Sequence, residues 1–315
     1  MRISQDQLSL LGLCQIKGID WKLLAREAQR PGGLDRLLAG ELTERTPEAA
    51  ETAALIAQAF DSDRNVHALR AAAHAEDERA AAVGADLVTV LDPGYPRTLR
   101  LIFNLPPFLY VKGRLLEQDL RSVAVVGTRE PTEGGLERAA LMARLLVDAH
   151  VTVVSGLARG IDTAAHQATL EQGGRTIAVV GTGITRCYPK ENAELAERVA
   201  AAGAVVSQFW PSAPPATWSF PRRNITMSGI AQGTVVIEAS ATSGAKMQAR
   251  LALQHGKKVF LPRSLVERYP WAARYAKERH ARVVDEVEDV VRELADPAAI
   301  HADDQRRLQL SFGLG

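Results

Sequence analysis

The sequence predicts an α/β fold with a doubly wound, mostly parallel (extended Rossmann-like) sheet and a small N-terminal all-helical domain. Short, almost continuously apolar segments alternate with amphipathic segments through the middle of the chain, which is typical of parallel strands covered by helices on both faces. Several of these apolar segments are followed by Gly or Ser, and the first 82 residues show helical spacing instead. We therefore expect a helical domain over residues 1–85, the sheet domain over 86–296, and a polar tail over 297–315.

The N-terminal segment from Ser4 to Ala82 is rich in Ala, Leu, Arg and Glu, and its breaks divide it into short helices. One break, Ile16-Lys17-Gly18-Ile19, has two interpretations. It resembles the hairpin of a helix-hairpin-helix module, in which backbone amides contact a DNA phosphate. It also fits a tight turn in a small helical bundle, and we favour this plainer interpretation.

The sheet domain is expected to begin after a turn-rich junction, Asp92-Pro93-Gly94-Tyr95-Pro96, which follows the strand-like residues 87–90. Its expected strands are 123–126, 151–155, 176–180, 204–207, 235–237 and 258–261. Its expected helices are 133–149, 163–172, 192–202 and 244–255. This alternation is what a doubly wound sheet requires.

Composition sets limits on function. The 315 residues are 46% hydrophobic with a net charge of +1, so the chain can bury a full core and lacks the global basic field of a histone-like protein. The distant Cys14 and Cys187 have no metal-motif spacing and are expected to be reduced thiols. Without a signal-like or bilayer-length apolar run, we expect a cytoplasmic protein with no membrane insertion and no metal.

Residues that follow the predicted strands indicate a phosphate-binding rim, because ligands of doubly wound sheets bind at the carboxyl ends of the strands. Glycines there allow close approach of the backbone, and hydroxyl, ammonium and guanidinium groups supply donors for anionic oxygens. Acidic side chains are almost absent from these segments. The candidate binding residues are Gly127, Thr128, Arg129, Ser155, Gly156, Arg159, Gly181, Lys190, Phe220, Arg222, Arg223 and Asn224.

Aromatic residues precede the paired arginines of this rim. Phe220 lies two residues before Arg222 and is the better candidate for stacking on a nucleic-acid base. Trp210 and Trp218 are interpreted more plainly, as cover for the edge of the sheet. Arg129 follows a buried strand and a glycine directly, which favours a role in binding over a surface ion pair.

Other polar residues near the strand ends have plain structural interpretations. Asp162 is expected to be a helix N-cap, and His166 is expected to be structural, because no nucleophile or carboxylate stands beside it in the sequence. Glu238 could contact a ribose hydroxyl or pair with a nearby arginine. Gly181-Thr182-Gly183 lacks the third glycine of a dinucleotide fingerprint, since Arg186 stands there, so a dehydrogenase is disfavoured.

Several ordered motifs between about Asp92 and Leu294 closely resemble the DNA-processing protein A family (DprA, also called Smf). They are Val125-Val126-Gly127-Thr128-Arg129, Val153-Val154-Ser155-Gly156-Leu157-Ala158-Arg159-Gly160-Ile161-Asp162 with Ala165-His166, Ile177–Gly183 with Tyr188-Pro189 and Asn192, and Phe220-Pro221-Arg222-Arg223-Asn224. Tyr95-Pro96 and Leu109-Tyr110-Val111-Lys112-Gly113 look like the lead-in of that family.

This resemblance implies a single-stranded DNA-binding protein that forms a homodimer and loads RecA recombinase onto incoming DNA during natural transformation. It implies no catalytic turnover and no cofactor. It also implies that the candidate residues above, apart from Arg159, form the DNA pocket. The chemistry of the residues agrees, with a phosphate at Arg129, the backbone guided by Lys190, Arg222 and Arg223, and a base on Phe220. The helical domain would resemble a sterile-alpha-motif fold, and the tail over 297–315 leaves no room for the winged-helix domain that many members add.

Departures from the family pattern concentrate in the second half of the chain. Gly-Ser-Arg becomes Gly127-Thr128-Arg129, Ser-Glu becomes Ser207-Gln208, and Arg-Asn-Arg becomes Arg223-Asn224-Ile225. The Ser-Gly-Ser region reads Ser243-Gly244-Ala245, and the final Pro-Gly reads Pro262-Arg263. These changes leave a diverged paralogue open.

Two other functions are consistent with the residues. The first is a nucleotide-binding receptor or a phosphoribohydrolase of the related lysine-decarboxylase-like (LOG) group, although the Pro-Gly-Gly-x-Gly-Thr turn of that group is missing here. The second is a scaffold with a vestigial pocket. Binding of mononucleotides, of oligothymidine or of neither distinguishes the three.

Overall fold

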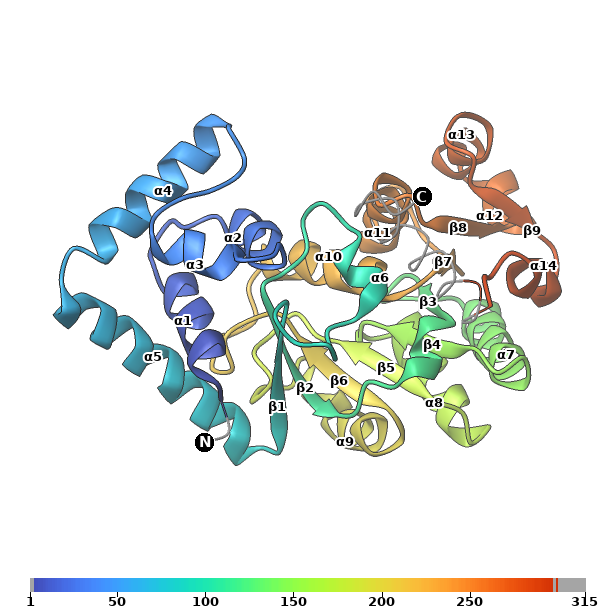
Figure 1. The fold of residues 1–315 in the computed structure, drawn as a ribbon. Coiled ribbons are helices and arrows are strands. Elements are labelled where there is room, and N and C mark those ends of the chain that lie inside the picture. Colours follow the sequence, from blue (N-terminus) through green and yellow to red (C-terminus); the bar gives the residue numbers. More distant parts are fainter. Residues whose placement is uncertain (1–2, 297–298, 300–315) are drawn as a thin grey trace.

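The computed structural model describes residues 3–296 and residue 299 (Figure 1). The proposed polar tail therefore lies, apart from residue 299, outside the described residues. Five helices precede the first strand: α1 (Gln5–Cys14), α2 (Trp21–Ala28), α3 (Gly33–Leu38), α4 (Pro47–Ala59) and α5 (Asp63–Ala82). Side chains of Ser4, Asp20, Thr46 and Ser62 cap the N-termini of four of them, which explains why the helices begin there.

A sheet of nine strands forms the centre of the molecule, in the order β1-β2-β6-β5-β4-β3-β7-β8-β9. Its strands are β1 (Ala85–Thr89), β2 (Phe108–Gly113), β3 (Ser122–Val126), β4 (Thr152–Ser155), β5 (Thr176–Val179), β6 (Ala204–Ser207), β7 (Gly233–Val236), β8 (Lys258–Pro262) and β9 (Arg282–Val284). The β1–β2 and β2–β6 pairs are antiparallel and all other pairs are parallel. The predicted doubly wound, mostly parallel sheet is confirmed.

Helices cover both faces of the sheet. On one face lie α7 (Glu133–Asp148), α8 (Ile161–Glu171) and α9 (Ala193–Ala202), and on the other lie α6 (Arg97–Arg100), α10 (Ser219–Ile230) and α11 (Gly244–Gln254) (Figure 1). The helices α12 (Arg263–Arg268), α13 (Pro270–Glu278) and α14 (Val287–Arg292) accompany β8 and β9. Single 3₁₀ turns, η1 (Glu117–Leu120) and η2 (Lys190–Asn192), complete the elements.

The seven strands expected from the sequence lie close to observed strands, because most of their residues are apolar and buried, whereas β2 and β9 are not among the expected strands. Val123, Ala124 and Val125 of β3 are completely buried, as two-sided cover requires. Helix α8 starts at Ile161, two residues earlier than expected, and its N-cap is Gly160. The expectation that Asp162 is the N-cap is therefore wrong.

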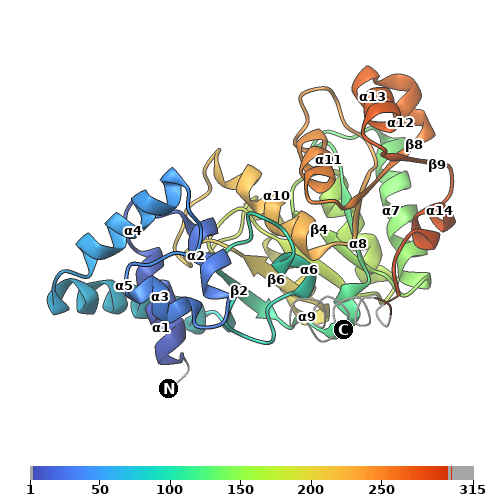
Figure 2. The same ribbon diagram turned by 45° about the horizontal axis from the view of Figure 1, so that its top comes forward.

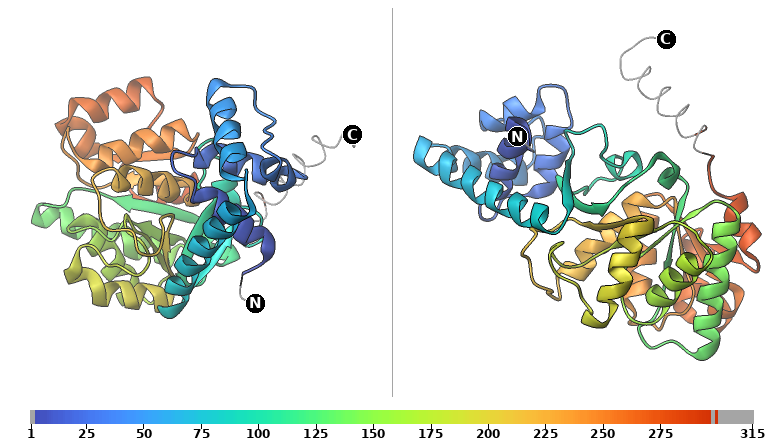
Figure 3. Two further views of the ribbon diagram at one scale, coloured as in Figure 1. Left: turned by 90° about the vertical axis from the view of Figure 1, so that its left-hand side faces the viewer. Right: turned by 90° about the horizontal axis from the view of Figure 1, so that it is seen from below.

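The helices α1–α5 lie at the β1 end of the sheet, and α12 and α13 lie at the opposite end (Figures 2 and 3). One continuous apolar cluster contains Leu10 of α1, Phe108 of β2 and Val206 of β6. The ring of Trp21 stands 5.0 Å from Phe108 and 5.8 Å from Trp210, so aromatic contacts tie α2 to the sheet. Within residues 3–296 and 299, none of the helices combines the length and apolar character that crossing a bilayer requires.

Candidate nucleic-acid interface

The candidate site lies at the topological switch point of the sheet. Strand β3 pairs with β4 on one side and with β7 on the other, so the connections that leave the carboxyl ends of β3 and β7 run to opposite faces. Between them lies a cavity of about 400 Å³, which we call the rim cavity. Its lining includes Gly127, Thr128 and Arg129 after β3, Phe220, Arg223 and Asn224 of α10, and Ser243 and Gln248 around the start of α11.

Phe220 lines the rim cavity, with a cation and a second ring beside it. The Arg129 guanidinium lies 5.2 Å from the centre of the Phe220 ring, and the Tyr188 ring lies 5.7 Å away at an interplanar angle of 48°. Phe220 is half-buried, whereas Tyr188 is 44% exposed. Aromatic faces beside an arginine are suited to stacking of bases and binding of phosphates.

Gly181 explains why the Phe220 ring can lie where it does. A Cβ atom on Gly181 would stand 2.7 Å from Cδ1 of Phe220, too close for any side chain. The strand end at Gly181 therefore supports the ring from behind, and Gly181 itself lines neither cavity of the site. Its role is to position Phe220 rather than to contact a ligand.

A smaller hollow of about 30 Å³, the side cavity, adjoins the same ring. It is lined by Arg129, Gly156, Arg159, Tyr188 and Phe220, among others. Arg159 is exposed and forms an ion pair with Glu191 of η2. This pair raises the pKa of Arg159 and lowers the pKa of Glu191, in both cases mainly through the side-chain hydrogen bond. Glu130 and Asp162 also line the rim cavity, so the expectation that acidic groups are almost absent from the rim is wrong.

Two oppositely charged groups, the Asp162 carboxylate and the Arg223 guanidinium, are buried and line the rim cavity together with Phe220. Asp162 accepts hydrogen bonds from the backbone N–H groups of Gly156 (3.1 Å) and Ala158 (3.4 Å), and Arg223 donates to the carbonyl of Val179 (2.8 Å). Burial raises the pKa of Asp162 and lowers the pKa of Arg223, while their mutual attraction opposes both shifts. Arg223 is thus buried and hydrogen-bonded rather than an exposed cation, and its expected contact with a phosphate stays a prediction.

Three further candidates line neither the rim cavity nor the side cavity. Arg222 lines a different cleft, next to the turn between α1 and α2, so the expected Arg222–Arg223 pair points in two directions. The Ser155 hydroxyl is buried and donates to the carbonyl of Val125 at 2.6 Å, which makes it structural. Lys190 lies exposed at the start of η2, outside both cavities but two residues from Tyr188.

His166 and Glu238 have the plain roles expected for them. The His166 ring is completely buried with Nδ1 2.7 Å from Thr176 Oγ1, and burial lowers its pKa to about 3. Glu238 accepts a hydrogen bond from the Thr132 hydroxyl at 2.8 Å and pairs with Arg138 at 3.5 Å. Neither side chain is positioned as a catalytic base.

Sequence reasoning missed two residues of the site. Tyr188 is not among the candidates from the sequence, although its position eight residues after the expected strand 176–180 marks it as a second aromatic of the rim. Gln248 lines the rim cavity although it is 1% exposed, and one end of its amide has no hydrogen-bond partner among the described residues. The sequence pattern could not reveal the burial of Gln248, because a glutamine on α11 reads the same in the sequence whether its amide is buried or exposed.

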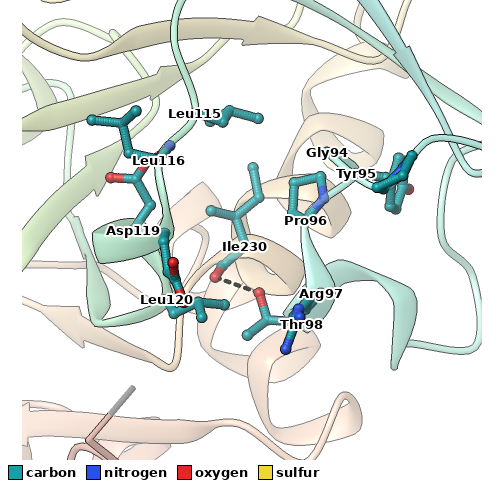
Figure 4. Close-up of a pocket in the computed structure, with 12 residues that line it drawn as sticks. Gly94, Tyr95, Pro96, Arg97, Thr98, Leu115, Leu116, Asp119, Leu120 and Ile230 are labelled. Atoms are coloured by element: carbon teal, nitrogen blue, oxygen red, sulfur yellow. Dashed lines mark hydrogen bonds between the residues drawn. The ribbon is translucent and has the colours of Figure 1, made fainter. Parts of the chain in front are cut away.

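Another cavity, of about 270 Å³, lies near the amino-terminal ends of the strands, where Leu120 precedes β3 and Ile230 precedes β7 (Figure 4). Its polar groups already have partners: Thr98 donates to the carbonyl of Ile230 at 2.8 Å, and Asp119 pairs with Arg175 at 2.6 Å. In the described part of the chain, no group of three or more His, Cys, Asp or Glu side chains could hold a metal ion. The rim at the carboxyl ends thus remains the candidate site.

A Rossmann-like sheet with an arginine, two aromatic rings and glycines near its switch point has the chemistry that suits an anionic, ring-containing ligand. The chain belongs to the family of DNA recombination-mediator protein A, whose model matches residues 86–295. It is 35% identical over 206 residues to DNA processing protein DprA of Streptococcus pneumoniae, covering 65% of this chain and 73% of that protein. It is 41% identical over 178 residues to protein Smf of Synechocystis, and the match spans 55% of this chain and only 45% of that protein.

Solved structures agree with this assignment. The X-ray structure of DprA from Streptococcus pneumoniae matches with a TM-score of 0.72 and 27% identity, over 94% of this chain and 100% of that one. DNA processing protein A from Helicobacter pylori, described for its single-stranded DNA binding mode, has the same fold with a TM-score of 0.59 and 22% identity, over 66% of this chain and 94% of that one.

Proposed function

We propose that this protein binds single-stranded DNA and, as a homodimer in the cytoplasm, loads RecA recombinase onto incoming single strands during natural transformation. The observation that carries the proposal is the contact of Arg129 with Phe220 at the switch point of the sheet. Membership of the recombination-mediator family and the single-strand binding named for the Helicobacter pylori relative support it. No catalytic turnover is part of the proposed role.

The chemistry of the rim favours a strand over a mononucleotide phosphate as ligand. Arg223 is buried and attracted by Asp162, whereas the side chains of Arg129, Lys190 and Arg159 are exposed, Arg159 in an ion pair with Glu191. A line of exposed cations beside two aromatic rings suits a sugar-phosphate chain with its bases turned inward. In this proposal Arg129 contacts a phosphate while a base stacks on Tyr188 and Phe220.

Titration of the full chain with labelled oligothymidine and with a duplex of the same length tests the proposal by fluorescence anisotropy. We expect preference for the single strand and an affinity that falls with salt, with a slope of roughly −0.7 per phosphate contacted. Arg129→Ala should weaken binding by about 2 kcal/mol, about 30-fold in Kd, because charge-assisted bonds are lost. Arg198→Ala, an exposed arginine on α9, is the matched control.

Two outcomes would contradict this assignment. Equal affinity of Arg129→Ala and the unaltered protein would remove Arg129 from the site, and equal affinity for duplex and single strand would remove the proposed substrate class. The RecA step has its own measurement: the protein should shorten the lag of RecA ATPase activity on DNA covered by single-strand-binding protein. An unchanged lag, with strand binding intact, would leave a DNA-binding protein without the loading role.

A mononucleotide receptor is the second candidate, because the rim cavity of about 400 Å³ has apolar walls and an amide at Gln248. A phosphoribohydrolase is less well supported, since Asp162 is held by two backbone N–H groups and Glu238 by Thr132 and Arg138. Calorimetry with nucleoside monophosphates and with a short oligothymidine separates the receptor from the strand binder. Binding of the monophosphate alone would favour the receptor.

A further inference from the structure

Helix α10 carries a second aromatic–arginine pair on a different face from Phe220. Trp218 and Arg222 are four residues apart and therefore share one side of the helix start, whereas Phe220, Arg223 and Asn224 share another. The Arg222 guanidinium lies 5.4 Å from the centre of the Trp218 ring, which repeats the arrangement of Arg129 over Phe220. Trp218, Phe220 and Arg222 lie within five residues of one another at the start of α10, so the two rings stand on neighbouring parts of one element.

Trp218 is placed as an open platform rather than as cover for the sheet. It is 56% exposed, the largest exposed aromatic of the described residues, and the buried Phe209 supports its ring edge-on at 5.8 Å. The exposed ring and the arginine beside it together offer a flat face and a positive charge, which suit a nucleic-acid base and its phosphate. Bases of a single strand stack on such rings with little regard to sequence.

Arg222 leads from this platform into a cleft of about 330 Å³, which we call the interdomain cleft. One wall consists of residues 18–22, the turn between α1 and α2, and the other consists of residues 104–106 with Gln208 and Arg222 (α2 and α10 in Figure 1). Lys22 and Arg222 bring positive charge, and Asp20 offsets part of it through a 3.2 Å pair with Lys22. The lining thus carries net positive charge, and the exposed Lys17 directly precedes its first residue, Gly18.

The turn itself offers backbone donors. Gly18 has a φ of +85°, which a side chain would strain, and both Lys17 and Gly18 are exposed. Within the described residues, their N–H groups have no hydrogen-bond partner. Exposed amides next to lysine side chains are suitable donors to a phosphate. These donors support the second interpretation of Ile16–Ile19, a hairpin whose amides contact a phosphate. Arg222 lines the same cleft as this turn.

We propose that the interdomain cleft is a second subsite for the same DNA strand, which leaves Phe220, crosses Trp218 and Arg222, and places a phosphate at the turn of residues 17–22. This inference rests on the proposed single-strand binding and extends its footprint onto the N-terminal helices. The subsite is a backbone site, since its groups are cations and amides rather than a set of base-edge contacts.

Anisotropy titrations with oligothymidines of about 6 and about 20 nucleotides, within and beyond the size of one such binding surface, test the proposal. Trp218→Ala/Arg222→Ala and, separately, the exposed Lys22→Glu should each weaken binding of the long strand about tenfold and lower its salt slope by roughly 0.7 per phosphate lost. Both variants should bind the short strand with the same affinity as the unaltered protein. Arg268→Ala is the matched control, because Arg268 is exposed and also lies 5.4 Å from a ring, that of Tyr269 on the far side.

Each result decides between distinct conclusions. Equal weakening for both lengths would place Arg222 in the Phe220 site and overturn the second subsite. Unchanged binding of the long strand in both variants would overturn it as well, while leaving the proposed function intact. If the unaltered protein bound neither strand, the proposed function would fail and the subsite with it.

Discussion

Gly156 lies directly against the guanidinium group of Arg223, so closely that a Cβ atom on Gly156 would overlap Nη1 of that arginine. The arginine cannot move aside easily, because it is buried, donates a hydrogen bond to the carbonyl of Val179 and is attracted by the Asp162 carboxylate. The glycine that the sequence assigns to phosphate binding therefore serves first to admit a buried charge.

Gly156→Ala should lower the free energy of unfolding by about 1–3 kcal/mol, since overpacking of a buried site displaces side chains or backbone. Urea denaturation followed by circular dichroism measures the change. Gly94→Ala is the control, because a Cβ atom there meets nothing within 4 Å. An unchanged urea midpoint in Gly156→Ala would show that Arg223 has room to shift.

Gly181→Ala should weaken binding of single strands without touching a ligand, because the added methyl group displaces the Phe220 ring. We expect a loss close to that of Phe220→Leu, about 1–3 kcal/mol for one base stack. Anisotropy with oligothymidine compares the two variants. If Phe220→Leu lost affinity and Gly181→Ala did not, the ring would have another stable position for stacking.

Glu191→Gln should tighten binding of single strands about two- to fivefold at low salt, because it releases Arg159 from its exposed ion pair and removes a negative charge beside the side cavity. The gain should fade as salt rises. Glu194→Gln, an exposed carboxylate on α9, changes the net charge equally and should leave the affinity unaltered. Equal gains in both variants would indicate a general charge effect only.

Stability should decrease as the pH falls below about 6.5. Burial lowers the pKa of His166 to about 3 and that of His255 to about 4, below the ordinary 6.5 of a histidine. The unfolded chain therefore takes up protons between these values while the folded protein does not, so stability is complete above pH 6.5 and is lost towards pH 3–4.

The expected slope is at most about 1.4 kcal/mol per pH unit for each histidine. Urea midpoints measured between pH 7 and 5 give this slope, and His166→Gln should reduce it. The exposed His67→Gln is the control and should leave it unchanged. A slope that His166→Gln does not alter would assign the acid sensitivity to other groups.

Much of the fold was predictable because its strands are buried on both faces and so read as apolar runs. Val123–Val126 and Ala204–Ser207 show this well, and the helix between Glu133 and Asp148 follows from ordinary amphipathic spacing. The antiparallel pairing of β2 with β6 was not predictable, because the paired residues are far apart in the sequence. Even Gly113 and Ala204, the pair with the smallest separation, are 91 residues apart.

The site was predictable in its position but not in the direction of its side chains. Arg222 and Arg223 are adjacent, and only the rotation of about 100° per residue along α10 sends one to the interdomain cleft and the other beneath Phe220. The inward turn of Ser155 and the pairing of Arg159 with Glu191 likewise depend on neighbours distant in sequence. Residue types at strand ends indicate a ligand class, whereas tertiary packing decides which of them remain free.

The apolar cluster shared by Leu10, Phe108 and Val206 bears on how this protein can be dissected. Cleavage of the chain near residue 85 would expose apolar surface on both fragments: the inner side of α2 on the first and the surroundings of Trp210 on the second. We expect calorimetry of the full chain to give a single endotherm, and the separated halves to aggregate. The contribution of the first 82 residues is therefore better measured with point substitutions than with truncations.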